Sequence, residues 1–172
     1  MKDLLADPGS QAINAVQGNA TRKIMEPDPK RELLRHMLAT VAFRCGIAID
    51  NAPFGFEDFR VGGSARSPAE ILAHLGDLIE GTRYLLQGQF VSLASKPHRW
   101  DDEIARFYTA IRELDSFLAT DMPLAHPVEK FVQGPIGDAL THVGQIVMLR
   151  RIFGSPITQE PYFSIEIVPG VF

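Results

Sequence analysis

Four segments of the sequence repeat apolar residues every three or four positions, the spacing that places side chains on one face of an α-helix. These segments cover about residues 29–49, 67–88, 101–120 and 135–153. At 1.5 Å per residue, each predicted helix is roughly 30 Å long. Amphipathic helices of similar length can bury their apolar faces against one another in a four-helix bundle. The sequence therefore predicts an all-α fold of this type.

The ends of two helices are marked by their residue types. Ser67 can cap the second helix, Pro68 suits its first position, and Glu70 completes a capping box. The fourth segment is followed by Gly154 and Pro156, which are typical of a helix end. Two of the connections between segments are long and contain prolines. We therefore expect long crossover connections in place of a simple up-and-down course.

The chain outside the four segments has little periodicity. Residues 1–28 are small and polar, and we predict an N-terminal arm there, followed by one helical domain over residues 29–172. Residues 157–172 are predicted to form an irregular C-terminal tail, although residues 163–168 alternate briefly and could be extended.

Charge and cysteine content exclude several classes of protein. Lys and Arg number 17 against 21 Asp and Glu, so the net charge is −4, and no basic stripe suggests nucleic-acid binding. The single cysteine, Cys45, excludes an internal disulfide and a Cys-rich zinc site, and it fits a reducing compartment. No apolar run reaches membrane-spanning length, and two early acidic residues do not fit a secretory signal. We expect a cytoplasmic protein that binds neither nucleic acid nor membrane.

Three polar side chains share one side of the fourth helix. Asp138, His142 and Gln145 follow one another a turn apart, in line with apolar residues, so we expect them to point into the interior. A buried carboxylate is costly unless it is compensated. The partner could be a metal ion, a cation or a hydrogen-bond network. On the second helix, His74 lies at the edge of the apolar stripe and Asp77 lies further round, toward solvent.

A carboxylate four residues before a histidine is by itself only weak evidence for a metal site. Glu32 and His36 have the same spacing, and so do Glu70 and His74. A histidine near an apolar stripe is most often an ordinary hydrogen-bonded residue, and Cys45 has the spacing of a small core residue. No nucleophile elbow, phosphate-binding loop or ferritin-like Glu-x-x-His pair is present in the sequence.

The end of the fourth segment resembles a known family. Residues 142–154 read His-Val-Gly-Gln-Ile-Val-Met-Leu-Arg-Arg-Ile-Phe-Gly and are followed by Pro156. This string resembles the last helix of the DinB/YfiT-like metal-binding bundles. The Ala-His-Leu triplet around His74 resembles their second helix. The resemblance covers roughly residues 30–165 and includes the order of the four helices and the long crossovers.

The resemblance implies a fold and a metal site. Family members form four-helix bundles, often with an up-down-down-up course, and many are dimers, so a homodimer is expected. Their usual site takes one histidine from the second helix and two, four residues apart, from the fourth. The matching positions here are His74, Asp138 and His142, with an aspartate where histidine is commoner. Two histidines and a carboxylate can bind zinc, nickel, iron or manganese, and Gln145 is a candidate to orient one of them.

The resemblance also implies a function. Family members of known activity include thiol S-transferases that use bacillithiol or mycothiol, and a mycothiol-dependent isomerase. We therefore expect a divalent-metal-dependent enzyme that acts on a small electrophile by S-transfer or hydrolysis, with a low-molecular-weight thiol as a possible cofactor. The alternative is a non-catalytic helical bundle that binds a small ligand or a protein partner.

Overall fold

The computed structural model of the chain describes residues 28–172, and these residues contain helices and no strand. The elements are α1 (Pro29–Ile49), α2 (Pro68–Leu86), α3 (Trp100–Leu118), α4 (Val128–Phe131), a π-helical turn η1 (Val132–Ile136) and α5 (Gly137–Ile152). The all-α prediction is therefore confirmed for this part of the chain. The predicted arm lies outside the described residues, except for Asp28.

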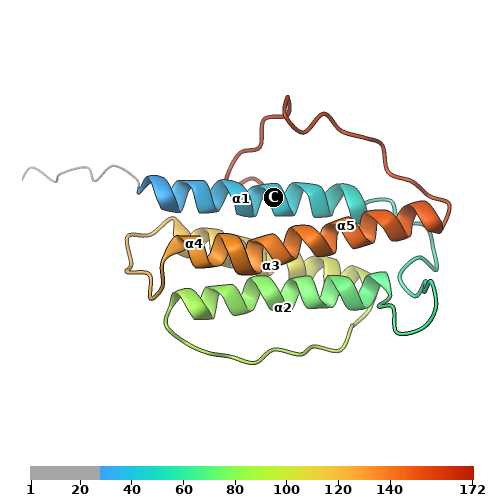
Figure 1. The fold of residues 1–172 in the computed structure, drawn as a ribbon, viewed down its shortest axis with the longest axis horizontal. Helices are drawn as coiled ribbons and strands as arrows, with labels where there is room; N and C mark the ends of the chain where they lie inside the picture. The colour runs from blue at the N-terminus through green and yellow to red at the C-terminus, as the bar shows by residue number, and fades with distance from the viewer. Residues whose placement is uncertain (1–27) are drawn as a thin grey trace, which may run out of the picture.

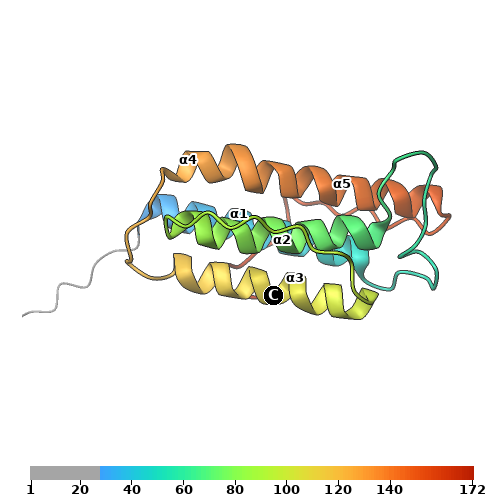
Figure 2. The same cartoon turned by 90° about the horizontal axis from the view of Figure 1, so that it is seen from below.

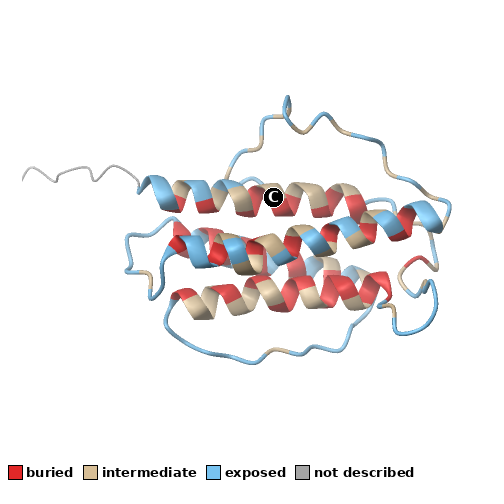
Figure 3. Cartoon of the chain, in the orientation of Figure 1, coloured by how far each residue is buried: buried red, intermediate tan, exposed pale blue. Residues whose placement is uncertain are grey.

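The four long helices lie side by side around a shared apolar core (Figures 1 and 2). α1 packs against α3 and α5, and α2 packs against the same two helices. α1 and α5 run in one direction, whereas α2 and α3 run in the other (Figure 1). Buried residues line the inward faces of the helices (Figure 3). The largest fully buried side chains include Leu38, Leu72, Leu75, Phe107 and Ile111.

Side-chain caps explain where the first two long helices begin. The Asp28 carboxylate accepts a hydrogen bond from the Lys30 amide at 2.9 Å, and Pro29 takes the first helical position. At α2, the Ser67 hydroxyl accepts from the Glu70 amide at 3.3 Å, while the Glu70 carboxylate accepts from the Ser67 amide at 2.9 Å. The predicted capping box is therefore present, and the Glu70 carboxylate is one of its hydrogen-bond acceptors.

The last helical segment begins earlier than predicted. The sequence pattern suggests a start at Pro135, whereas the helical segment starts at Val128 and passes through η1, with Pro135 inside it. In an α-helix, proline removes one hydrogen bond and its ring clashes with the carbonyl four residues earlier. The wider π-helical turn accommodates that ring, so the segment continues into α5 without ending. The turn ends two residues before Asp138.

The connection between α2 and α3 runs back along the bundle because these two helices are parallel (Figure 1). α2 has 19 residues, so the connection must travel about 28 Å. Residues 87–99, called the strap below, can span about 43 Å when extended, which is sufficient. The strap is a long crossover of the kind that was expected.

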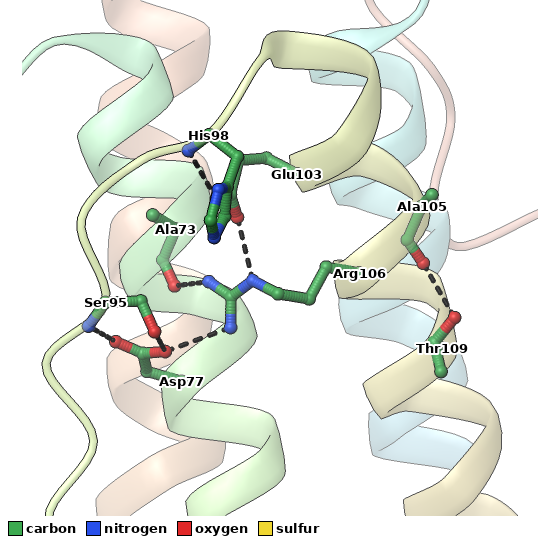
Figure 4. A network of polar contacts seen from close by, with 8 residues as sticks. All are labelled: Ala73, Asp77, Ser95, His98, Glu103, Ala105, Arg106 and Thr109. Atoms are coloured by element: carbon green, nitrogen blue, oxygen red, sulfur yellow. Dashed lines mark hydrogen bonds and ion pairs between the residues drawn. The ribbon is translucent and has the colours of Figure 1, made fainter.

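A charged network fastens the strap to α2 and α3 (Figure 4). Arg106 donates from Nη1 to Asp77 Oδ1 and from Nε to Glu103 Oε2, both at 2.9 Å, and from Nη2 to the Ala73 carbonyl. Asp77 also accepts bonds from the Ser95 amide at 2.7 Å and the Ser95 hydroxyl at 2.6 Å. The second Glu103 oxygen accepts from the amide of strap residue 98. The network therefore joins three segments of the chain.

The network corrects the position expected for Asp77. Its side chain is only 7% exposed, not turned to solvent, because the strap and Arg106 cover it. Gly76 makes this arrangement possible, since a Cβ there would lie 2.8 Å from the Arg106 guanidinium carbon. A side chain at this position would displace the guanidinium, so glycine favours its close approach to α2.

The C-terminal tail contains no helix or strand and returns along α1 (Figure 1). Phe172 packs against the core at its end. The irregular form predicted for residues 157–172 is observed. No helix in the described residues is long and apolar enough to cross a membrane.

Candidate metal centre

The three predicted ligands meet where α2 packs against α5. His74 comes from α2, and Asp138 and His142 come from α5. His142 Nε2 lies 3.5 Å from Asp138 Oδ1, and His74 Nε2 lies 3.9 Å from Asp138 Oδ2. One potential ligand atom from each residue lies within 4.8 Å of the other two. Of the residues that the structure describes, this is the group of three whose geometry suits a metal ion.

The spacing on α5 explains why two ligands come from one helix. Residues four apart on a helix lie one above the other, so Asp138 and His142 face the same point. Ligand atoms bound tetrahedrally at about 2.1 Å from an ion lie about 3.4 Å apart. The carboxylate oxygens lie 3.5 Å from His142 Nε2 (Oδ1) and 3.9 Å from His74 Nε2 (Oδ2), and one donor atom from each residue lies within 4.8 Å of the other two, so small side-chain movements would bring the three atoms around one ion.

The site is more open than expected. The side chain of His142 is 12% exposed and that of His74 is 34% exposed, but that of Asp138 is 49% exposed. The prediction that Asp138 points into the interior is therefore wrong. Its neighbour Ala139 takes the fully buried position, and the carboxylate lies at the surface seam between α2 and α5. Solvent can stabilise the charge of this carboxylate, so its burial is not an argument for a metal ion. The argument for a metal ion is the convergence of the carboxylate with two imidazoles.

Gln145 orients the His142 ring. Its Oε1 lies 3.1 Å from His142 Nδ1. An amide oxygen only accepts, so this hydrogen bond requires the proton on Nδ1 and leaves the lone pair on Nε2. Nε2 is the atom that faces Asp138. The His74 and His142 rings meet edge to face, with centroids 4.7 Å apart.

The surroundings of His74 favour its neutral imidazole, the form that binds metals. Burial lowers the pKa of His74 below its ordinary value of 6.5, and the neighbouring His142 and Arg66 lower it further. The carboxylates of Asp138 and Asp77 oppose this shift without reversing it. The neutral form of His74 is therefore favoured, and in this form the ring loses no proton on binding an ion.

Replacing Gln145 with leucine should weaken metal binding without abolishing it. The change removes the partner that holds the His142 ring, and loss of such a partner typically lowers metal affinity about 10- to 100-fold. Zinc titration against a competing chromophoric chelator measures the effect. Gln133→Leu, on an exposed position of η1, is the control and should bind as the wild type does. Equal affinity in both variants would remove Gln145 from the site.

Other carboxylates and histidines with the same spacing lie elsewhere. Glu32 pairs with Arg35, and His36 is exposed on α1. His98 and His126 are exposed on connections, as expected.

Cys45 is fully buried, and burial raises the pKa of its thiol, so it is a core residue and not a nucleophile.

A cavity of about 620 Å³ opens beside His74. Its lining includes Arg60 and Arg66 from the α1–α2 connection and Lys96 from the strap. Sequence reasoning missed these cations because they lie in connections, where no periodicity indicates which residues come together. The cavity provides space for a small molecule next to one of the candidate ligands.

Comparison of the chain with protein-family models, curated proteins and solved structures finds no match. The chemical assignment of the site therefore rests on its geometry. Two imidazole nitrogens and one carboxylate oxygen suit a first-row divalent ion. Three protein ligands leave coordination positions open, which is typical of catalytic rather than structural sites. The partly exposed Asp138 side leaves the site accessible from solvent.

Proposed function

We propose that this protein is a divalent-metal-dependent enzyme with a four-helix bundle of the DinB/YfiT-like type. The observation that carries the proposal is the convergence of His74, Asp138 and His142 from two helices, although His74 and Asp138 are 64 positions apart in the sequence. The opposite directions of the α1/α5 and α2/α3 pairs match the course that the resemblance implies (Figure 1). The strap supplies the long crossover.

The donor set suits zinc, nickel, iron or manganese. A divalent ion with open positions lowers the pKa of a water or thiol bound to it, and so makes a nucleophile available near neutral pH. Asp138 in place of histidine supplies a harder ligand and one more negative charge. That charge favours binding of the cation itself.

The residues of the chain then have distinct tasks. His74, Asp138 and His142 hold the ion, and Gln145 maintains the His142 tautomer in which Nε2 is free. The cavity beside His74 receives a small electrophilic substrate. A low-molecular-weight thiol or water is the nucleophile, so the reaction is S-transfer or hydrolysis.

The test begins with protein purified without an affinity tag or added metal. Mass spectrometry should find about one equivalent of a divalent metal per chain. Bacillithiol and mycothiol are then screened with the electrophile 1-chloro-2,4-dinitrobenzene, and hydrolysis of small esters is measured in parallel. Turnover should disappear on chelation and return when the metal is restored.

The alternative function makes a different prediction in the same experiment. A non-catalytic bundle that binds a ligand or partner needs no ion, and Asp138 would then be paired with a cation, such as a protonated histidine. A metal-free protein that takes up no zinc, nickel, iron or manganese on titration contradicts the proposed enzyme and supports this alternative.

A further inference from the structure

We propose that the cavity beside His74 binds a small dicarboxylate through Arg66 and Lys96. The role of that anion as substrate rests on the proposed function, whereas its binding to the cavity does not. The cavity lies between the α1–α2 connection, the first half of α2 and the strap. Its volume of about 620 Å³ is within the usual range for small-molecule sites.

The charges that line the cavity do not cancel. Arg60 lies 2.5 Å from Glu70, so these two residues neutralise each other. The second acid, Asp77, is engaged by Arg106 and Ser95. Arg106 also pairs with Glu103, so the residues that line the cavity keep a net charge of +1. Arg66 and Lys96 are the two cations of this wall that form no ion pair among the described residues. A ligand with two negative charges complements them.

The backbone of the strap around Lys96 is fixed by its neighbouring residues. The adjacent Ser95 donates two hydrogen bonds to Asp77, and Figure 4 shows this anchor together with Arg106. Two residues earlier, Leu93 packs over Gly81, where a Cβ would lie 3.9 Å from its methyl carbon. Pro97 follows and restricts the backbone on the other side of Lys96. The wall that carries this lysine is thus anchored to α2 before a ligand arrives.

The two cations favour carboxylates. The planar guanidinium of Arg66 can donate two parallel hydrogen bonds to one carboxylate, and the Lys96 ammonium can bind a second as a point charge. Both side chains are exposed at the cavity, so the ligand need not be buried completely. His74 belongs both to the cavity wall and to the candidate metal centre, so a bound dicarboxylate would lie next to the ion.

The experiment measures succinate binding by calorimetry at low salt, first with wild-type protein freed of metal on a chelating resin. Arg66→Gln and Lys96→Gln should each weaken binding about tenfold, and the double variant should lose it. Lys130→Gln, an exposed lysine on α4, is the matched control and should bind as the wild type does. The neutral diamide succinamide should not bind.

The outcomes separate the two proposals. If the wild type binds zinc but binds no succinate with or without zinc, the anion site is overturned and the metal centre stands. Equal succinate affinity in the wild type and the double variant also overturns the anion site. If succinate binding depends on Arg66 and Lys96 but no metal binds, the anion site is supported and the metal-dependent function fails.

Discussion

Replacing His142 with alanine should lower the affinity of the protein for zinc by more than about 100-fold. Loss of a residue that only orients a ligand costs about 10- to 100-fold, and His142 is itself a proposed ligand. It is the least exposed of the three side chains, and its Nε2 lies 3.5 Å from Asp138. Its loss leaves one imidazole and one partly exposed carboxylate. Competition with a chromophoric chelator gives the two dissociation constants.

Two variants make this result specific. His36→Ala removes an exposed histidine that also follows a carboxylate by four residues, and it should leave zinc affinity unchanged. Asp138→His provides three imidazoles and should retain zinc with altered preference among metals. Unchanged zinc affinity in His142→Ala, with circular dichroism identical to the wild type, is inconsistent with the proposed ligand set.

Replacing Arg106 with alanine should destabilise the fold by about 3–5 kcal/mol, the usual cost of removing one partner of a buried ion pair. The change leaves two carboxylates without their cationic partner: that of Glu103, which is fully buried, and that of Asp77, which is 7% exposed. It also removes the donor to the Ala73 carbonyl, next to His74. For a chain of this size, the loss corresponds to a fall in Tm of roughly 10 °C. Thermal and urea unfolding followed by circular dichroism measure it.

The matched control lies on the same helix. Arg112 is exposed and donates one hydrogen bond to Thr109, so Arg112→Ala should change stability by less than about 0.5 kcal/mol. The loss of stability in Arg106→Lys should lie between those of Arg106→Ala and Arg112→Ala, because lysine keeps the charge but lacks the planar guanidinium that reaches several acceptors. Equal effects of Arg106→Ala and Arg112→Ala would show that the network contributes little to stability.

The effect of Arg106 should depend on pH. Burial alone would raise the pKa of Asp77, but the bonds from Ser95 and Arg106 outweigh it and hold that pKa below 3.8. A carboxylate with a depressed folded-state pKa stabilises the fold above its unfolded pKa, and this contribution is lost as pH falls through the folded value. The Asp77 part of the difference between wild type and Arg106→Ala should therefore be complete at pH 7 and shrink below about pH 4.

Local signals predicted most of the helices. The observed bounds of α1 coincide with the predicted ones, which came from the spacing of its apolar residues. The start of α2 lies at the predicted capping box. The last segment begins earlier than its sequence pattern predicts, because a proline such as Pro135 usually marks a helix start and only the π-helical turn accommodates it inside this helix.

Burial was harder to predict than helix position. A helical wheel treats each helix as isolated, so Asp77 was assigned to solvent although the strap covers it. For the same reason Asp138 was assigned to the interior, whereas the seam between α2 and α5 leaves it half exposed. The grouping of His74 with Asp138 and His142 came from a family resemblance, since nothing local in either helix indicates that α2 and α5 are neighbours. No pattern in the sequence indicates that Arg66 and Lys96 line the same cavity.

The most direct measurement is an anomalous difference map from crystals of the untagged protein grown with one equivalent of zinc per chain, recorded at the zinc absorption edge. We expect one strong peak about 2.0–2.2 Å from His74 Nε2, an Asp138 carboxylate oxygen and His142 Nε2. A structure in which these three side chains surround no peak, while zinc is present in the crystal, would contradict the metal centre.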